Sequence, residues 1–412
     1  MSSCPIHNIL DPDVFAEGMP YDALAELRQQ GPIIRMEDDI TGVPYWLVTR
    51  REELDYIERK PDIFSSQARS AMPMEDDQEF VDNISAKMMI NMDEPRHMAM
   101  RRVVRDAFTP KAVAQHLPFL EKHAKWVIDQ VAPKGECEFV TEVAAELPLL
   151  AILHLLDVPA EDRDKVFDWT NRMMFADDPD SSGGKDDAEA ASVELMTYAF
   201  ELKQKWDAEP RDTVTGALLR GEIDGKPIDD EEFMWMFLMT ITAGNESTRT
   251  SISQGMRLLM EHPDQLEWLR QNPQEIPNAV DEMLRYNTAF VCMKRTALED
   301  HQVGDTLIKK GDKIILHYHT VNHDEQVFGQ DATKFDVTRA QRHKDLGRDL
   351  RSFGTGSHFC LGTHLAKQEM CIMFNEILPR LRNPQFAGPV KYMRSYFING
   401  IKEMPIRYTP EG

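Results

Sequence analysis

The chain has 412 residues, of which 42% are hydrophobic, and a formal net charge of −23 at pH 7. This length can bury one large core or a few small ones. The acidity argues against a nucleic-acid-binding protein, because such proteins gather Lys and Arg on the face that contacts phosphates.

The cysteines lie at irregular intervals, without a CxxC pair or an even-numbered framework. Small secreted domains use such frameworks, so the pattern favours a reducing compartment. No apolar run approaches the ~20 residues that span a bilayer, and the stretch MSSCPIHNILDPDVF lacks the basic and apolar regions of a signal peptide. We therefore expect a cytoplasmic protein without a membrane anchor.

The first part of the chain mixes two kinds of pattern. Residues 21–31 have helical spacing, whereas residues 32–36 and 45–54 resemble strands, which predicts a small sheet packed against helices. From about residue 95 to residue 270, nearly every segment has helical periodicity. The chief interruption, residues 175–190, is rich in Asp, Ser and Gly and predicts an exposed, mobile loop.

The longest predicted helix begins near Asp229 and ends near Pro263. Asp229 can cap it, since Glu232 follows three residues later. Residues 233–242 are apolar on every face and should be buried. Residues 243–248, AGNEST, then place a glycine and a carboxylate in mid-helix, where a glycine costs about 1 kcal/mol relative to alanine and a buried acid needs a partner. Two interpretations stay open, a solvent-facing turn and a functional break at a polar pocket.

Strand patterns return late, in residues 305–320 and 397–410. There is no internal repeat and no low-complexity linker. We expect a single domain over residues 1–412, mainly helical, with small peripheral sheets.

The segment FGTGSHFCLG, residues 353–362, surrounds Cys360 with glycines. The commonest fate of a free cysteine is burial as a small hydrophobe. The glycines favour another interpretation, because they let the backbone turn tightly and approach a large flat object. Helical periodicity resumes directly afterwards, and a helix N-terminus favours a thiolate. No second cysteine has zinc-site spacing and no His and Asn pattern indicates a protease, so a thiolate that holds a metal inside a bulky cofactor fits better.

This segment resembles the haem-binding signature of the cytochromes P-450, Phe-x-x-Gly-x-x-x-Cys-x-Gly, which Phe353, Gly356, Cys360 and Gly362 meet in full. The resemblance implies the mainly α cytochrome P-450 fold, with a long central helix over haem b. It also implies that the Cys360 thiolate binds the iron, in a loop that Phe353, Gly354 and Gly362 shape around the haem.

Two further sets of residues match the family in order. His97, Arg101, Arg295 and His358 match its partners for the haem propionates, which need cationic or hydrogen-bonding groups when buried. The ExxR motif, Glu282 and Arg285, and a third partner at Arg339 imply the structural ion-pair network behind the haem. Without the resemblance, Glu282 and Arg285 would be an ordinary helix-surface pair.

The AGNES segment resembles the oxygen-site signature of the family. It implies that Glu246 and Ser247 relay protons, with Thr248 as a possible substitute, and that the missing side chain of Gly244 leaves room for dioxygen. Ser247 replaces the usual threonine and lacks the methyl group that fixes its rotamer, so proton delivery could be less well coupled. The other departures from the family pattern are Ala289, His323 and Lys367.

The resemblance also implies an apolar substrate pocket, although a Met-rich helix face is more often plain core. Residues 243–255 look like the group that oxidises sterol side chains, terpenoids and branched aliphatics, so we expect hydroxylation of a steroid, a terpenoid or a fatty-acid-like compound. The expected pocket walls are Met88, Met89, Met239, Thr242, Ala243, Phe290, Val291, Met293, Phe397 and Ile398.

Electrons should come from a partner, because the chain has neither a flavin fingerprint nor an Fe–S cysteine cluster. We expect a monomer that uses a 2Fe–2S ferredoxin and its reductase, docked on a basic face with Arg102, Arg105, Arg351 and Lys367. Two alternatives stay open. A peroxide-driven peroxygenase would not need the relay of Glu246, and a haem sensor or scaffold would not turn over at all.

Overall fold

The computed structural model describes residues 6–75, 77–174, 178, 183–206 and 213–411. The chain forms two compact units, each built from three stretches of sequence. Unit 1 comprises Met1–His97, Pro277–Cys360 and Tyr392–Gly400, and unit 2 comprises Met98–Ile276, Leu361–Lys391 and Ile401–Gly412. The single domain expected from the sequence stays a prediction.

Unit 1 combines short helices with most of the strands. Its helices are α1 (Tyr21–Gln30), α2 (Arg51–Glu58), α3 (Gln78–Asn83), α12 (Ile276–Tyr286, from its second residue), α13 (Tyr318–Val321), α14 (Glu325–Phe328) and α15 (Leu346–Asp349). Its strands are β1 (Ile33–Glu37), β2 (Pro44–Val48), β3 (Phe64–Ser65), β7 (Cys292–Ala297), β8 (His301–Val303), β9 (Thr306–Ile308) and β10 (Lys313–His317).

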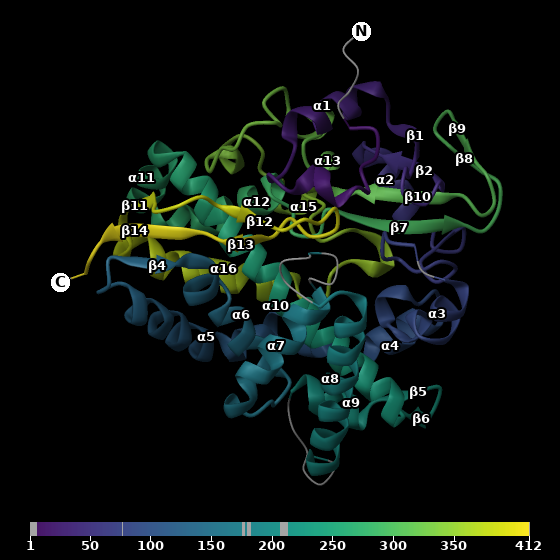
Figure 1. The fold of residues 1–412 in the computed structure, drawn as a ribbon, viewed down its shortest axis with the longest axis horizontal. Helices are drawn as coiled ribbons and strands as arrows, with labels where there is room; N and C mark the ends of the chain where they lie inside the picture. The colour runs from purple at the N-terminus through teal and green to yellow at the C-terminus, as the bar shows by residue number, and fades with distance from the viewer. Residues whose placement is uncertain (1–5, 76, 175–177, 179–182, 207–212, 412) are drawn as a thin grey trace. The chain divides into compact units, whose positions relative to one another are not determined.

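The main sheet of unit 1 has the order β1-β2-β10-β7-β3, and Figure 1 labels the first four of these strands. β2 and β10 pair in parallel, and the other neighbours are antiparallel. Successive residues of a strand point to opposite faces, so Ile314 and Ile315 belong to two different core clusters. One cluster contains Leu27 of α1, and the other contains Leu54 and Ile57 of α2. Helices therefore pack on both faces of the sheet, as the first part of the sequence predicts.

Unit 2 contains the long helices. They are α5 (Pro110–Val131), α6 (Glu146–Leu155), α7 (Arg163–Met174), α8 (Lys185–Trp206), α9 (Val214–Arg220), α10 (Asp230–Glu261), α11 (Pro263–Gln271) and α16 (Thr363–Arg380). Its strands are β4 (Glu136–Glu138), β5 (Glu222–Ile223), β6 (Lys226–Pro227), β11 (Arg382–Phe386), β13 (Ile401–Glu403) and β14 (Pro405–Thr409). Two further elements, α4 (Arg96–Arg105) and β12 (Lys391–Tyr392), contain the boundary between the units. α5 and α16 lie side by side near the sheet β11-β14-β4 (Figure 1).

The longest helix, α10, begins where the sequence predicts. Asp229 and Glu232 form a full capping box, and 32 residues follow it, or about 48 Å of helix. The helix continues through residues 243–248 without a break. Asn245 and Glu246 are buried, so this segment is neither a solvent-facing turn nor an interruption of the helix.

The mainly α fold class is confirmed, and the differences concern short elements. Of residues 45–54, only the first part is a strand, because α2 begins at Arg51. The region predicted as all helix also contains β4, β5 and β6. α8 begins at Lys185, inside the predicted 175–190 loop, and residues 175–177 and 179–182 of that loop lie outside the described residues.

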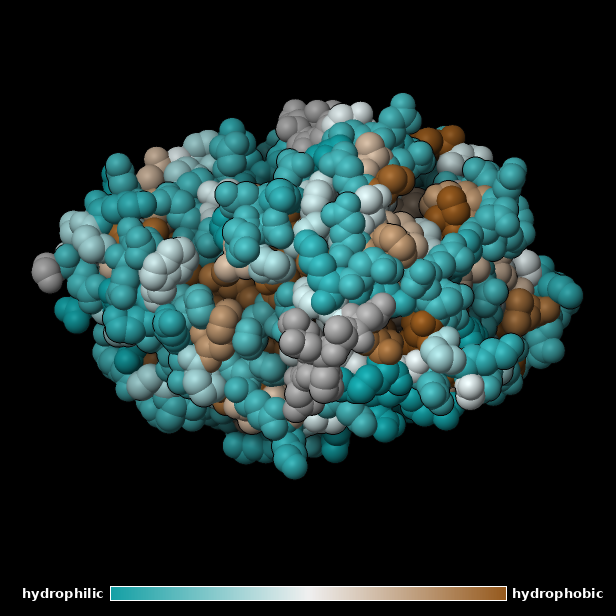
Figure 2. Space-filling view, turned by 90° about the horizontal axis from the view of Figure 1, so that it is seen from below, coloured by the Kyte–Doolittle hydropathy of each residue, from teal (hydrophilic) through white to brown (hydrophobic). Residues whose placement is uncertain are grey.

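The surface agrees with a composition in which 28% of residues are charged. Figure 2 shows a face covered mainly by hydrophilic residues, with small hydrophobic areas between them. Among the residues that the structure describes, no helix is both long enough and apolar enough to cross a bilayer.

Candidate active site

Cys360 lies in an irregular loop, three residues before α16 begins. Its backbone amide donates a hydrogen bond to the Phe353 carbonyl oxygen at 3.0 Å. Gly354 and Gly356 have φ angles of 65° and 67°, which residues other than glycine rarely adopt. Cys360 is exposed, and it lies just ahead of a helix, as the sequence predicts.

The buried cysteines differ from Cys360 in accessibility. Cys137 and Cys292 are buried, and burial raises the pKa of each thiol to about 12. Both thiols therefore stay protonated near neutral pH, and only a thiolate binds a metal well. Among the described cysteines, Cys360 is the exposed one.

Glu58, the last residue of α2, supports the cysteine loop. Its Oε2 accepts a hydrogen bond from the backbone N–H of Thr355 at 2.7 Å. Its own carbonyl oxygen would lie 2.3 Å from a Cβ atom at position 356, which explains why Gly356 has no side chain. No sequence pattern indicates this role, because Glu58 and Thr355 are 297 positions apart.

Two residues predicted to contact the propionates stack on one another within unit 1. The rings of His97 and His358 have centroids 3.9 Å apart and planes inclined by 22°. The His358 Nε2 atom lies 3.3 Å from the Ser66 hydroxyl, and the His97 Nδ1 atom lies 3.6 Å from the Glu94 carboxylate. A third predicted partner, Arg101, follows His97 by one turn on α4.

The fourth predicted partner, Arg295, is buried on β7. Its Nη1 donates to the Lys294 carbonyl oxygen at 2.8 Å, and its Nη2 donates to Glu58 Oε1 at 3.4 Å. A guanidinium group has five N–H donors, and the Nε–H of Arg295 has no partner among the described residues. Arg295 can therefore still bind an anionic group. With the exposed thiol of Cys360 in the same unit, these donors fit a cofactor that combines an iron with carboxylates.

Glu282, Arg285 and Arg339 form one fully buried ion-pair network in unit 1. Arg285 donates to both carboxylate oxygens of Glu282, at 2.7 and 2.8 Å, and the Arg339 Nε lies 3.1 Å from both. Other N–H groups of the two arginines donate to backbone carbonyls of residues 322–334. Removing one partner from such a buried pair costs about 3–5 kcal/mol, so the network fixes α12 against this segment.

The two predicted relay residues of α10 have different surroundings. Glu246 is buried, forms an ion pair with Arg249 and accepts a hydrogen bond from the Thr250 hydroxyl at 3.1 Å. Burial raises the pKa of Glu246, while Arg249 and Thr250 oppose that rise. Arg249 also donates to the Asn171 side chain of α7 at 3.0 Å. The ion pair of Glu246 and Arg249 is therefore held by a second helix as well.

Ser247 and Thr248 come next on α10. Ser247 is half-buried, and its hydroxyl donates to the Ala243 carbonyl oxygen at 2.9 Å. A hydroxyl has a single hydrogen, so Ser247 can accept a hydrogen bond in this rotamer but must rotate before it can donate one elsewhere. Thr248 is buried.

The expectation that Gly244 leaves room for dioxygen is wrong. A Cβ atom at Gly244 would lie 2.7 Å from Cδ1 of Ile152 on α6. The space beside this glycine is occupied by the neighbouring helix, and its absent side chain lets α6 and α10 approach closely.

Of the pocket residues predicted in unit 1, four lie together. The rings of Phe290 and Phe397 have centroids 5.0 Å apart, the Val291 amide donates to the Phe397 carbonyl oxygen at 2.8 Å, and Phe290 pairs with Ile398 in an isolated β-bridge. Met293, in contrast, packs against the core of the main sheet.

The remaining predicted pocket residues occupy two other segments. Met88 and Met89 flank the start of a 3₁₀ turn before α4, where Met89 is buried and Met88 half-buried. Met239, Thr242 and Ala243 share one face of α10 through their helical spacing, and none of the three is buried.

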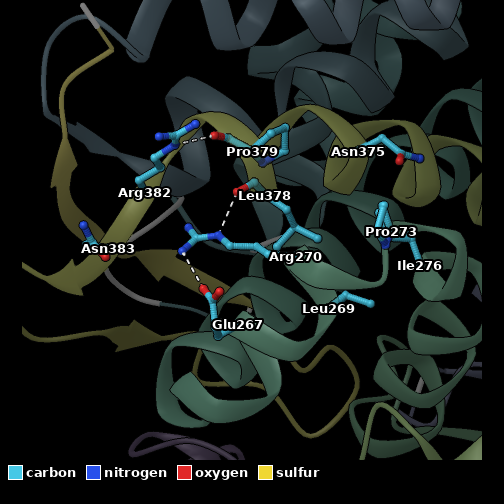
Figure 3. Close-up of a pocket in the computed structure, with 10 residues that line it drawn as sticks. All are labelled: Glu267, Leu269, Arg270, Pro273, Ile276, Asn375, Leu378, Pro379, Arg382 and Asn383. Carbon is cyan, nitrogen blue, oxygen red and sulfur yellow. Dashed lines mark hydrogen bonds and ion pairs between the residues drawn. The ribbon is translucent and has the colours of Figure 1, made fainter.

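A cavity of about 620 Å³ in unit 2 contains none of the predicted site residues. Figure 3 shows Arg270 of α11 pointing toward Leu378 near the end of α16, to whose carbonyl oxygen it donates at 2.8 Å. Arg270 also donates to the Leu381 carbonyl oxygen at 2.7 Å. These are carbonyls that the end of a helix leaves without intrahelical partners. Arg270 therefore serves to cap the C-terminal end of α16, and we do not assign the active site to this cavity.

The predicted basic face is only partly exposed. Arg102 and Arg105 are exposed, and Lys367 is half-buried. Arg351 is only 6% exposed, and its Nε and Nη2 atoms bind the Asp55 carboxylate at 2.5 and 2.7 Å. The expectation that Arg351 lies on the surface is wrong.

Known proteins similar to this chain agree on one family. The family model for cytochrome P-450 matches residues 151–384. The chain is 37% identical over 407 residues to a steroid C26-monooxygenase of Rhodococcus jostii, covering 97% of this chain and 84% of the relative. It is 30% identical over 411 residues to the linalool 8-monooxygenase of Pseudomonas putida, covering 98% of this chain and 99% of the relative. A solved structure of a Mycobacterium marinum cytochrome P-450 in complex with pseudoionone has a TM-score of 0.86 at 28% identity and covers 94% of both chains.

Proposed function

The chain belongs to the cytochrome P-450 family, and we propose that this monooxygenase hydroxylates a C–H bond of a hydrophobic small molecule. The observation that carries the proposal is the exposed Cys360 thiol, in one unit with the stacked His97 and His358 rings and the incompletely paired Arg295. These are the groups that would hold a haem through a thiolate and its two carboxylates.

Members of this family bind haem through a cysteine thiolate. In our proposal Cys360 is that ligand, His97, Arg101, Arg295 and His358 hold the propionates, and the glycines of residues 353–362 let the loop approach the ring. When bound, the haem activates dioxygen, and electron donation from the thiolate favours cleavage of the O–O bond.

We assign proton delivery to Glu246 and Ser247, with Thr248 as the substitute. The Ser247 hydroxyl donates to a helix carbonyl, so it can accept a hydrogen bond from water and pass on a proton only after it rotates. Glu246 is tied to Arg249 and must release that pair before it can supply a proton. General acid–base groups of this kind contribute about 10²- to 10⁴-fold to a rate.

For the substrate we propose a steroid, a terpenoid or another branched aliphatic compound. The similar proteins include a steroid C26-monooxygenase, a linalool 8-monooxygenase and a cytochrome P-450 in complex with pseudoionone, and all three of these small molecules are hydrophobic. The apolar contacts among Phe290, Val291, Phe397 and Ile398 suit such a ligand.

We propose a 2Fe–2S ferredoxin with its reductase as the electron source, docking on the exposed Arg102 and Arg105. The peroxygenase and the haem sensor stay as alternatives. Reconstitution separates them, because the proposed enzyme needs nicotinamide, reductase and ferredoxin for product, a peroxygenase needs only peroxide, and a sensor gives no product with either.

Replacing the proposed iron ligand tests the haem assignment. Cys360→His should abolish the red-shifted band of the reduced carbon monoxide complex that the family shows, even where some haem remains. Cys371→Ser, which changes a half-buried cysteine of α16, is the control and should keep the band. An unchanged band in Cys360→His would assign the iron to another residue.

A spectral titration with steroids, terpenes, fatty acids and aromatic acids then identifies the substrate class by displacement of iron-bound water.

A further inference from the structure

Unit 1 contains a buried carboxylate that the proposed function does not use. The side chain of Glu58, at the end of α2, is 1% exposed. A buried carboxylate is costly unless donors compensate it, so its partners indicate what it does.

Three donors from three different segments meet at Glu58. The Tyr318 hydroxyl, at the start of α13, donates to Oε1 at 2.6 Å. The backbone amide of Thr355, in the cysteine loop, donates to Oε2 at 2.7 Å. The Nη2 of Arg295, on β7, lies 3.4 Å from Oε1. Glu58 therefore joins the cysteine loop to the arginine that is predicted to hold a haem propionate.

The geometry favours an ionised Glu58. All three partners are donors, and a carboxylate accepts from all of them without a hydrogen of its own. A protonated carboxyl group could donate only to the Tyr318 hydroxyl, because the Thr355 amide and the Arg295 guanidinium can only donate. The buried Arg295 would then lose the carboxylate with which it forms an ion pair. Burial raises the pKa of Glu58, while Arg295, Tyr318 and Thr355 oppose that rise and Asp55 adds to it.

The same helix also holds the chain two residues before the loop, at Arg351. Asp55, one turn before Glu58 on α2, binds both Nε and Nη2 of Arg351. Asp55 also forms ion pairs with Arg51 and Arg59. Asp55 thus supports the chain next to the loop without touching Arg295, which makes it a matched control for Glu58.

We propose that Glu58 is a positioning residue that fixes Arg295 and the cysteine loop for the haem and, as a buried negative charge, lowers the reduction potential of the haem iron. This inference rests on the proposed function. One electron from an external donor reduces the ferric haem, and a negative charge nearby opposes that gain of negative charge. Because the carboxylate is desolvated, solvent screens it weakly.

The test compares Glu58→Gln with Asp55→Asn in the haem-loaded protein. Glutamine has nearly the shape of glutamate and can still accept hydrogen bonds, but it lacks the charge. We expect Glu58→Gln to retain the thiolate band of the reduced carbon monoxide complex and to show a higher reduction potential than the parent by spectroelectrochemistry. Asp55→Asn should shift the potential less, because Asp55 is already neutralised by a bidentate arginine. Equal potentials in the parent and Glu58→Gln, or equal shifts in both variants, would overturn the inference.

A second variant covers the case in which Glu58→Gln does not take up haem. Tyr318→Phe keeps both Glu58 and Arg295 but removes the hydroxyl that partly compensates the carboxylate, so the potential should fall below that of the parent. An unchanged potential would show that Glu58 acts only on the loop conformation and would refute the electrostatic role. If the parent itself lacked the thiolate band, the proposed function would fail, and not this inference alone.

Discussion

Gly356 controls the conformation of the cysteine loop through both its backbone and the space beside it. Its φ is 67°, and a Cβ atom would lie 2.3 Å from the Glu58 carbonyl oxygen. The left-handed conformation costs about 1–2 kcal/mol for a residue with a side chain, and the overlap adds about 1–3 kcal/mol. We therefore expect Gly356→Ala to destabilise the fold by about 2–5 kcal/mol in denaturant unfolding and to lower the haem content.

Gly311 provides a matched control for this prediction. Its φ is 86°, but a Cβ atom there would meet nothing within 4 Å. Gly311→Ala should lower the free energy of unfolding only by the cost of the left-handed backbone, about 1–2 kcal/mol, and the haem content should stay normal. Equal losses of stability in the two variants would show that the contact with Glu58 adds nothing.

The Ser247 hydroxyl should affect the share of electrons that end in hydroxylated product more than the rate of nicotinamide oxidation. Ser247→Ala removes the hydroxyl alone, so the fold and the substrate-induced spectral shift should survive. Because water can replace one donor in a relay, we expect the low end of the 10²- to 10⁴-fold range or less. Nicotinamide oxidation should continue while hydrogen peroxide rises and hydroxylated product falls. Ser247→Thr should keep or improve coupling, because threonine has the stiffer rotamer.

Ser251 offers the control for this experiment, since its hydroxyl donates to the Ser247 carbonyl oxygen at 2.8 Å in the same way, one turn later. Ser251→Ala should leave the ratio of peroxide to product unchanged. Full coupling in Ser247→Ala would transfer the relay to Thr248 or to water alone.

At this scale, a site is easiest to predict from sequence where its residues are close along the chain. Glu282 and Arg285 are three residues apart, and the residues of the cysteine signature lie within a single loop. Prediction failed for Glu58, whose donors are 237–297 positions away. It also failed for Arg351, because the exposure of a long cation depends on a distant carboxylate, here Asp55, 296 positions away. Gly244 was misinterpreted since its neighbour, Ile152, belongs to another helix.

At the scale of elements, a cluster of ion pairs joins α1, α2 and α14. Arg28 of α1 and Arg50, just before α2, bind the Glu325 carboxylate at 3.0 and 2.9 Å. Burial alone would raise the pKa of Glu325, but the hydrogen bonds from Arg50 and Arg28 lower it to about 2. A carboxyl group whose pKa is depressed in the folded state stabilises the fold above its unfolded pKa, and this contribution is lost as the pH falls toward the folded value.

Glu325→Gln should therefore be less stable than the parent at neutral pH, by about 1 kcal/mol because the carboxylate is partly exposed. The gap in melting temperature should close as the pH falls from about 4.5 toward 2, where the parent carboxylate becomes protonated. Glu26→Gln removes an exposed carboxylate of α1 and should show no such convergence. A gap that stays constant down to the lowest pH would mean that Glu325 contributes through its shape and not its charge.

Long elements with local signals could be predicted, and short paired ones could not. α10 was placed correctly because its capping box and apolar run lie within the element itself. The strands β4, β5 and β6 are two or three residues long, too short to show alternation, and β4 exists because β14, far along the chain, pairs with it. Strand β7 carries two buried cations, Lys294 and Arg295, in place of an alternating apolar pattern.

At the scale of the whole molecule, charge determines how a redox partner could bind. The chain has 70 acidic residues against 47 basic ones, so its long-range field repels an acidic ferredoxin. Docking of the proposed ferredoxin would then depend on a local basic face. Because Arg351 is buried in a pair with Asp55, the predicted cations that remain on this face are Arg102, Arg105 and Lys367. Each exposed cation should accordingly carry a large share of the attraction.

Reversing one of these charges should slow electron delivery without affecting the substrate site. We expect Arg102→Glu and Arg105→Glu to lower the rate of ferredoxin-supported reduction at low salt and to flatten its dependence on ionic strength, because the Debye length of about 10 Å at 0.1 M screens exposed charges. Substrate affinity by spectral titration should stay nearly constant. Lys125→Glu, an exposed cation of α5 paired with Asp129, changes the net charge equally and should have little effect. If all three reversals slow reduction to the same extent, net charge and not a docking face governs the encounter; if none does, the ferredoxin binds elsewhere.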